Sequence, residues 1–143
     1  MTTARTLTVP APAPEAATKY FGAELAFEVD PDDLVRDLDA GRTDGYVVVE
    51  TRAEEAYAQA RIPGAINLPY KDMTAESTQH LDRDLVYVCY CESIHCNAAT
   101  KGALKLAELG FKVKRLSGGI TAWIAAGHPV EGAGETGEIR CAC

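Results

Sequence analysis

Two hydrophobic runs in the chain have the length and composition of buried β-strands. They are YVVVE, from Tyr46 to Glu50, and LVYVCY, from Leu85 to Tyr90. β-Branched and aromatic residues dominate both runs, which is typical of strands covered on both faces of a parallel sheet. A third, shorter run, KVKRL from Lys112 to Leu116, alternates between hydrophobic and polar residues. These patterns predict three strands.

A helical pattern fills the interval between the second and third runs. In NAATKGALKLAELG, small and hydrophobic residues repeat at helical spacing, and charged residues share the opposite face. Gly110 is expected to end this helix. A strand, a helix and a strand within about thirty residues form a βαβ unit, whose strands are parallel and whose crossover is almost always right-handed. The predicted fold class is therefore α/β.

A second helix is marked at both of its ends. In DPDDLVRDLDAG, Asp30 is the expected N-cap and Pro31 the first helical residue, and acidic residues occupy the first turn. Gly41 is expected to end the helix. The segment therefore predicts a short helix.

The two ends of the chain differ from its middle. MTTARTLTVPAPAPEAA is rich in Pro, Ala and Thr and has no sustained period, so residues 1–18 are expected to form a flexible arm. We expect one domain over residues 19–131. Residues 132–143 form a tail that carries Cys141 and Cys143.

Length and composition fit a single globular domain. The chain has 143 residues, of which 47% are hydrophobic and 24% charged, and this excludes a disordered or collagen-like chain. The net charge of −7 argues against a nucleic-acid partner, which would select a basic patch. No hydrophobic stretch approaches the roughly 20 residues that cross a bilayer, and no signal-peptide core is present. We expect a cytoplasmic protein whose partners are small molecules or proteins.

Three of the five cysteines fall within CYCESIHC, from Cys89 to Cys96. Their odd number and close spacing favour reduced, reactive or metal-binding thiols over an extracellular disulfide framework. Ligand sites of open parallel sheets lie where strands lead into helices. Residues 91–97 form such a loop. Its main-chain amides, with those of the helix that begins near Asn97, are expected to surround the loop's centre and favour a thiolate there.

Three segments resemble the rhodanese-like domain family. VVVETRAEEAYAQARIPGAINLP resembles the family's first signature, and LVYVCYC resembles the strand that delivers its catalytic cysteine. LAELGFKVKRLSGGITAWIAAGHPVE resembles the closing segment with its double glycine and Trp. The resemblance implies a central parallel β-sheet flanked by helices on both faces. It also implies a single-domain sulfurtransferase that moves sulfane sulfur through a persulfide on the loop cysteine.

The resemblance assigns roles to particular residues. Cys91 is the expected nucleophile, because in the family an aromatic residue ends the strand before the cysteine and Tyr90 stands there. Cys89 shares a strand face with Cys91 and is expected to be packed in the interior. The expected substrate-binding residues are Arg52, Glu92, Ser93, Ile94, His95, Cys96 and Asn97. For Arg52 a buried salt-bridge network at adjacent strand ends is the alternative.

The cysteine loop departs from the common form of the family. It is two residues longer, it lacks the usual Arg, and it reads Cys, four residues, Cys-Asn. Longer loops in relatives accompany phosphate-sized substrates. A phosphatase, however, needs an Arg to clamp a dianion, and Glu92 adds repulsion. The predicted function is transfer of sulfane sulfur from thiosulfate or another donor, through Cys91, to a thiol or cyanide, with an acceptor protein as a further candidate and no cofactor.

Two alternatives use the same cysteines. Because the loop has no Arg, the domain could be a sulfur-carrier or binding module without turnover. A thiol-redox protein would use Cys96, five positions after Cys91, to resolve an intermediate as a disulfide. A metal-binding protein would combine Cys96 and His95 with the tail cysteines around zinc or copper(I). Gly118, Gly119 and Trp123 are expected to be structural.

Overall fold

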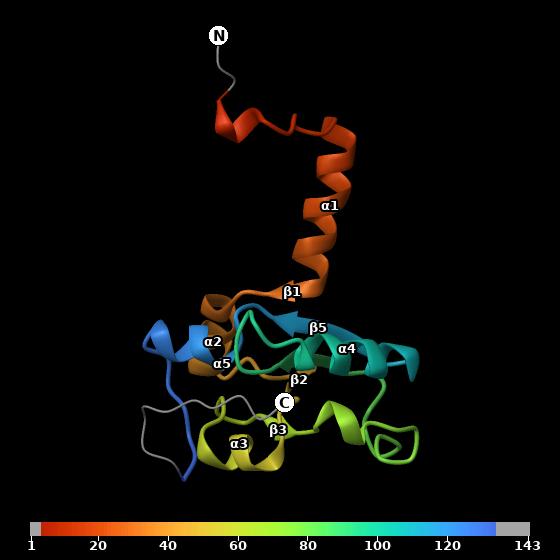
Figure 1. Ribbon diagram of the computed structural model, residues 1–143. Coiled ribbons are helices and arrows are strands. Elements are labelled where there is room, and N and C mark those ends of the chain that lie inside the picture. The colour runs from red at the N-terminus through yellow and green to blue at the C-terminus, as the bar shows by residue number, and fades with distance from the viewer. Residues whose placement is uncertain (1–3, 134–143) are drawn as a thin grey trace.

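A five-stranded parallel sheet forms the centre of the computed structural model, which describes residues 4–133 (Figure 1). The strands stand in the order β1-β5-β4-β2-β3. Their bounds are Glu28–Val29 for β1, Tyr46–Glu50 for β2, Ile66–Asn67 for β3, Val86–Tyr90 for β4 and Lys112–Leu116 for β5. The three predicted strands are β2, β4 and β5. The edge strands β1 and β3 have two residues each, too few for a pattern to indicate them.

Helices cover both faces of the sheet, so the predicted fold class is confirmed. The α-helices are α1 (Pro14–Phe27), α2 (Pro31–Asp39), α3 (Glu54–Gln59), α4 (Ala98–Glu108) and α5 (Gly119–Ala125), and the 3-10 helices are η1 (Arg5–Leu7) and η2 (Tyr70–Asp72). α4 lies on one face, and α2 and α5 lie on the other (Figure 1). Within residues 4–133, no helix is both long enough and hydrophobic enough to cross a membrane.

Alternation along the central strands builds two hydrophobic cores. Val48 and Val88 face the core beneath α2 and α5, where Trp123 is fully buried. Val49 and Cys89 face the opposite core, beneath α4. Full burial of a large hydrophobic side chain contributes roughly 1.5–3 kcal/mol, so both layers hold β4 in one register.

The predicted helix ends are confirmed. The Asp30 side chain accepts a hydrogen bond from the Asp32 amide at 2.8 Å, and Gly41 beyond α2 has a φ of 68°. α4 begins directly after Asn97, and Gly110 beyond its end has a φ of 95°. Local signals thus place both helices, and β4, α4 and β5 form the predicted parallel βαβ unit.

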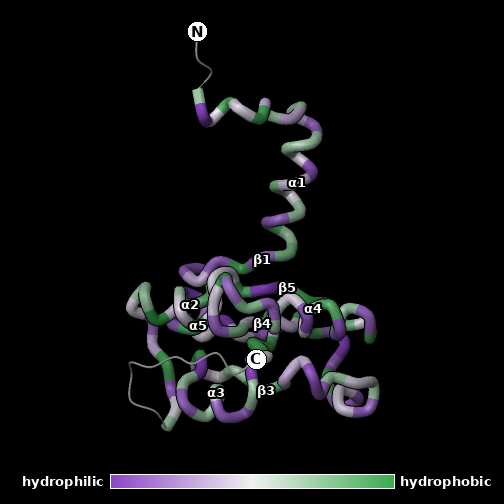
Figure 2. Tube along the Cα trace, in the orientation of Figure 1, coloured by the Kyte–Doolittle hydropathy of each residue, from purple (hydrophilic) through white to green (hydrophobic). Residues whose placement is uncertain are grey.

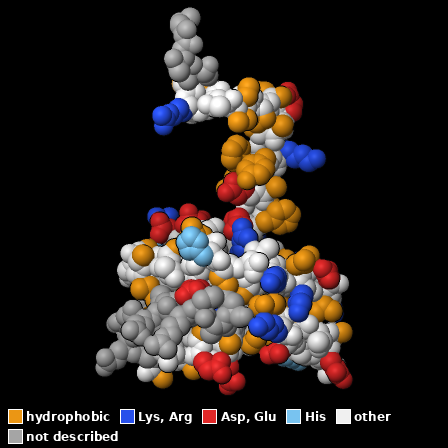
Figure 3. Space-filling view, in the orientation of Figure 1, with side chains coloured by type: hydrophobic (Ala, Val, Ile, Leu, Met, Phe, Trp, Pro, Cys, Tyr) orange, Lys and Arg blue, Asp and Glu red, His pale blue; other side chains and the backbone are white. Residues whose placement is uncertain are grey.

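The N-terminal segment differs from the prediction. α1 begins at Pro14, inside the residues expected to form an arm, because Pro14 occupies the start of the helix and Glu15 lies in its first turn. α1 buries none of its residues, and it stands away from the sheet with both hydrophobic and hydrophilic positions along it (Figure 2). Hydrophobic side chains lie on its surface (Figure 3). Its last turn leads directly into β1, the edge strand of the sheet.

A buried ion pair sits at the carboxyl end of β2. Arg52 donates from Nε to Glu50 Oε1 at 2.7 Å and from Nη2 to Glu50 Oε2 at 2.9 Å. Nη2 also donates to the carbonyl of Ala60 at 2.9 Å. Burial lowers the pKa of Arg52, but the hydrogen bond and negative charge of Glu50 outweigh it, so this pKa is raised. The pair stays charged and ties β2 to the chain that follows α3.

Removing one member of this pair should cost much of the protein's stability. We expect Arg52→Ala to lower the free energy of unfolding by about 3–5 kcal/mol, because it leaves the Glu50 carboxylate buried without its counter-charge. Urea denaturation measures the change. The matched control is Arg42→Ala, which removes an exposed ion pair with Asp37 and should cost less than about 1 kcal/mol. Equal losses in the two variants would contradict the structural role of Arg52.

Candidate active site

β4 ends at Tyr90, so Cys91 is the first residue beyond the central strand. Main-chain hydrogen bonds fix this point. The Ile120 amide donates to the Cys91 carbonyl at 2.9 Å, and the Thr121 amide donates to the Glu92 carbonyl at 2.8 Å. The start of the cysteine loop is therefore attached to the start of α5.

The attachment depends on the glycine that begins α5. Gly119 has a φ of 65°, and a Cβ at this position would lie 2.6 Å from the carbonyl oxygens of Cys91 and Glu92. Gly118 before it has a φ of 77°. Both glycines occupy the left-handed region that favours glycine. The double glycine allows the main chain of the loop and the turn after β5 to come into contact.

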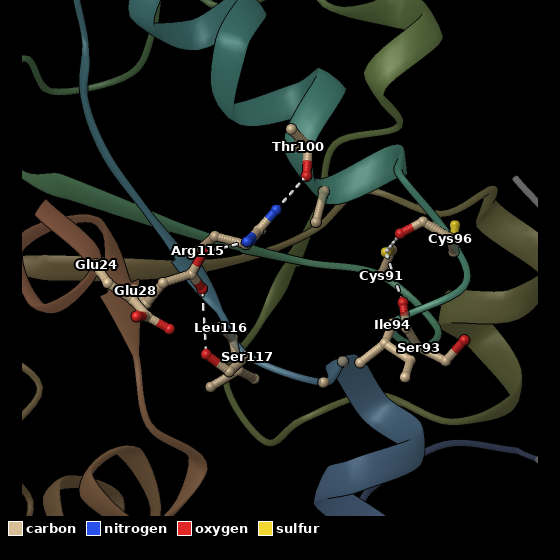
Figure 4. Close-up of a pocket in the computed structure, with 13 residues that line it drawn as sticks. Glu24, Glu28, Cys91, Ser93, Ile94, Cys96, Thr100, Arg115, Leu116 and Ser117 are labelled. Atoms are coloured by element: carbon tan, nitrogen blue, oxygen red, sulfur yellow. Dashed lines mark hydrogen bonds and ion pairs between the residues drawn. The ribbon is translucent and has the colours of Figure 1, made fainter. Parts of the chain in front are cut away.

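The thiol of Cys91 faces carbonyl oxygens of its own loop. Sγ donates to the carbonyl of Cys96 at 3.3 Å and, at 3.9 Å, to that of Ser93 (Figure 4). The sequence predicted that main-chain amides would converge on the centre of this loop, and within residues 4–133 no amide donates a hydrogen bond to Sγ itself. The amides of Cys96 and His95 instead donate to the carbonyl and the hydroxyl of Ser93. Sγ therefore contacts carbonyl oxygens on the side of its own loop.

A cavity of about 250 Å³ opens beside Cys91. The cysteine loop lines one side of it, and the ends of α1, β1 and β5 line the side across from the loop (Figure 4). Cys91 is only 3% exposed, yet it belongs to the lining. The cavity is therefore the part of the described surface from which Cys91 is approached.

Some of the predicted substrate-binding residues line this cavity and some do not. Those in the lining are Ser93, Ile94 and Cys96. Those outside it are Arg52, Glu92, His95 and Asn97. His95 and Asn97 are exposed, and Arg52 forms the buried ion pair that the sequence left as the alternative. Cys141 and Cys143 lie outside the described residues.

Sequence reasoning missed the polar residues across the cavity. Arg115 donates from Nη1 to Thr100 Oγ1 at 2.5 Å and from Nη2 to the Glu28 carboxylate. The Ser117 hydroxyl donates to the same carboxylate at 3.1 Å. Arg115 pairs with Cys89 in the parallel register of β5 and β4, so both side chains point to the sheet face of Cys91. The pairing of β4 with β5 could have indicated Arg115 from the sequence, because adjacent parallel strands bring their carboxyl ends together.

Cys89 is fully buried, as predicted, and burial disfavours the thiolate form that a nucleophile needs. Burial, with a smaller contribution from Cys91, raises the pKa of Cys89 to about 12. Cys89 therefore stays a neutral thiol at ordinary pH. Within residues 4–133, no three His, Cys, Asp or Glu side chains lie close enough together to hold a metal ion.

Comparison with known proteins identifies the family of this chain. Residues 30–126 match the family model of the rhodanese-like domain. The chain belongs to the rhodanese-like domain family. This membership supports a role related to sulfur transfer, as the resemblance in the sequence predicted.

Solved structures share the fold of this rhodanese-like domain. The BH2092 protein of Bacillus halodurans is 39% identical, with a TM-score of 0.80 over 84% of this chain and 87% of that chain. A thiosulfate sulfurtransferase from Pseudomonas aeruginosa is 31% identical, with a TM-score of 0.62 over 78% of this chain and 20% of that chain.

A curated relative is much longer than this chain. The HTH-type transcriptional regulator Rv0324 of Mycobacterium tuberculosis is 34% identical over 99 residues, which cover 69% of this chain and 42% of that protein. The rhodanese-like domain thus corresponds to less than half of the regulator.

Gly119→Ala should destabilise the protein more than the same change at a glycine with free space. The left-handed φ costs alanine roughly 1–2 kcal/mol, and the contact with the Cys91 loop adds roughly 1–3 kcal/mol. Gly127→Ala is the control, because Gly127 has a φ of 81° and a Cβ added there would meet no atom within 4 Å. Equal unfolding free energies for the two variants, measured in urea, would show that the contact between position 119 and the Cys91 loop does not affect stability.

The raised pKa of Cys89 predicts a dependence of stability on pH. The folded state holds the thiol proton more tightly, so the stability from this group is complete below pH 9 and is lost as pH rises toward 12. Between pH 8 and pH 10.5, the parent should lose about 2 kcal/mol more unfolding free energy than Cys89→Ala. Denaturation under reducing conditions measures this. Parallel losses in both proteins would contradict the assignment to Cys89.

Proposed function

We propose that this domain is a sulfurtransferase that carries sulfane sulfur as a persulfide on Cys91. The supporting observation is the place of Cys91 at the end of the central strand, in the lining of a cavity large enough for a small sulfur compound. Cys89 is unsuited to the role because it is fully buried and its pKa is raised. Cys91 and Cys96 both line the cavity, and Cys91 is the one that directly follows the central strand, where the family places its cysteine.

The reaction has two steps. The Cys91 thiolate attacks the sulfane sulfur of a donor, so that a new S–S bond forms and the donor's own bond to that sulfur breaks. Thiosulfate would leave as sulfite, and a persulfide would leave as a thiolate. An acceptor thiolate or cyanide then attacks the outer sulfur of the persulfide and restores the Cys91 thiolate.

The carbonyl oxygens of Ser93 and Cys96 accept hydrogen bonds from Sγ when Cys91 is a thiol. Because the nucleophile is the thiolate, we expect these two hydrogen bonds to break before the attack. A second candidate function is a sulfur carrier that accepts sulfur and releases it only to a partner, and the absence of Arg from residues 91–97 favours it.

Intact-mass measurement tests the proposal. Incubation with thiosulfate or inorganic polysulfide should add the mass of one sulfur atom, and peptide mapping should place it on Cys91. Cys91→Ser should abolish this adduct, whereas the control Cys89→Ala should retain it, because Cys89 does not line the cavity. An adduct that persists in Cys91→Ser would overturn the proposal.

Turnover separates the enzyme from the carrier. A sulfurtransferase produces thiocyanate or an acceptor persulfide many times per Cys91, and a carrier discharges once. Thiocyanate formation under excess donor and cyanide gives this number directly.

A further inference from the structure

The cavity beside Cys91 carries more negative than positive charge. Its lining holds the carboxylates of Glu24 and Glu28 and the guanidinium of Arg115, and no other charged side chain within residues 4–133 contributes to it. The three residues lie across the cavity from the cysteine loop (Figure 4). A site for a doubly anionic donor would be expected to show the opposite balance.

Glu28 and Arg115 neutralise each other. They are register partners on β1 and β5, and Nη2 of Arg115 donates to one oxygen of Glu28. Ser117 donates to the other oxygen, so this carboxylate is occupied on both sides. Arg115 uses two of its five N–H donors on Glu28 and Thr100. In the described part of the chain, its other donors have no hydrogen-bond partner and are available to a ligand oxygen.

Glu24 supplies the excess charge. It lies in the last turn of α1, it is exposed, and it has no ion-pair partner within residues 4–133. An ammonium group at the mouth of the cavity would find this carboxylate unoccupied. The cavity thus offers three separate contacts: the sulfur of Cys91, the remaining donors of Arg115 and the carboxylate of Glu24.

We propose that the substrate of this cavity is a small zwitterionic aminothiol, which acts as the sulfur acceptor or, as its persulfide, as the donor. Its carboxylate would bind Arg115, its ammonium group would bind Glu24, and its sulfur would meet Cys91. This assignment rests on the proposed function. The cavity volume of about 250 Å³ suits a molecule of this size, since drug-sized ligands occupy roughly 300–1,000 Å³.

The transfer balances without any other reactant. In the donor direction, the Cys91 thiolate attacks the outer sulfur of the aminothiol persulfide. The bond between Cys91 Sγ and that sulfur forms, the S–S bond of the donor breaks, and the aminothiol leaves as its thiolate. The proton on the transferred sulfur stays with it, and the acceptor reaction is the reverse in bonds and charges.

The test is the discharge of preloaded Cys91 by four matched thiols. Inorganic polysulfide loads the protein, excess reagent is removed, and intact mass follows the loss of one sulfur. The thiols are cysteine, cysteamine, 2-mercaptoethanol and 3-mercaptopropionate, which are zwitterionic, cationic, neutral and anionic. Each rate is divided by the rate of the same thiol with a small disulfide, which removes differences in intrinsic reactivity.

The corrected rate should be highest for cysteine, which carries both charged groups, and thiols with an ammonium group should exceed those without one. Cysteamine should exceed 3-mercaptopropionate by about two- to fivefold, in line with the strength of exposed charge interactions, and Glu24→Gln should remove most of this ratio. Arg115→Gln should lower the rate of cysteine relative to cysteamine. Glu15→Gln makes the same charge change in the first turn of α1, away from the cavity, and should keep the parent ratio.

The possible failures are distinct. If polysulfide places no sulfur on Cys91, the proposed function is wrong and this assignment is wrong with it. If Cys91 loads and the four corrected rates are equal, sulfur transfer stands and the aminothiol assignment is overturned. An equal change of the ratio in Glu15→Gln and Glu24→Gln would also overturn it, because the effect would then come from net charge alone.

Discussion

The position of Cys91 depends on β4 being hydrogen-bonded on both sides in a single register. β2 and β5 flank this strand, and its residues point alternately into two cores. A shift of one residue would move Cys89 and Tyr90 to the wrong faces and bury the wrong side chains. The cost of that exchange, spread over both cores, holds the end of the strand in place. This packing therefore fixes the position at which the cysteine loop begins.

Arg52 and Arg115 have different roles, and sequence reasoning considered only Arg52. Arg52 was expected to bind substrate, with a buried salt bridge as the alternative, and its guanidinium is buried against Glu50. Arg115 lies in the cavity lining with Thr100 and Glu28. Each arginine lies near the carboxyl end of a strand, and the two differ in the carboxylate that they contact. Glu50 is two residues before Arg52 in the chain, whereas Glu28 is brought to Arg115 by the pairing of β1 with β5.

Much of the fold could be predicted because its signals are local. The hydrophobic runs, the Asp30 cap and the glycine after α4 marked β2, β4, β5, α2 and α4 correctly. α1 was missed in part, because an alanine- and proline-rich composition hid a proline at the start of a helix. In the site, the strand-to-loop rule found Cys91 and its neighbours in the lining. It did not find the direction of the loop's carbonyl groups, because that depends on main-chain torsions that residue types do not specify.

Membership in the rhodanese-like domain family supports a role related to sulfur transfer, and the cavity beside Cys91 has its own set of charged residues. The positive group comes from a strand instead of the loop, and acidic residues accompany it. A carboxylate contributed by α1 extends the site beyond the segment that carries the cysteine. We infer that specificity in this domain is set by the edge of the sheet as well as by the loop.

The contact of Gly119 with the carbonyl groups of Cys91 and Glu92 has a consequence for protein engineering. A cysteine loop taken from a relative and grafted onto this scaffold would have to match a surface formed by a different part of the chain. Loop and turn behave as one transplantable unit, although more than twenty residues separate them in the sequence. A chimera that exchanges both segments together would preserve their fit, whereas a loop exchanged alone would meet a turn shaped for another main chain.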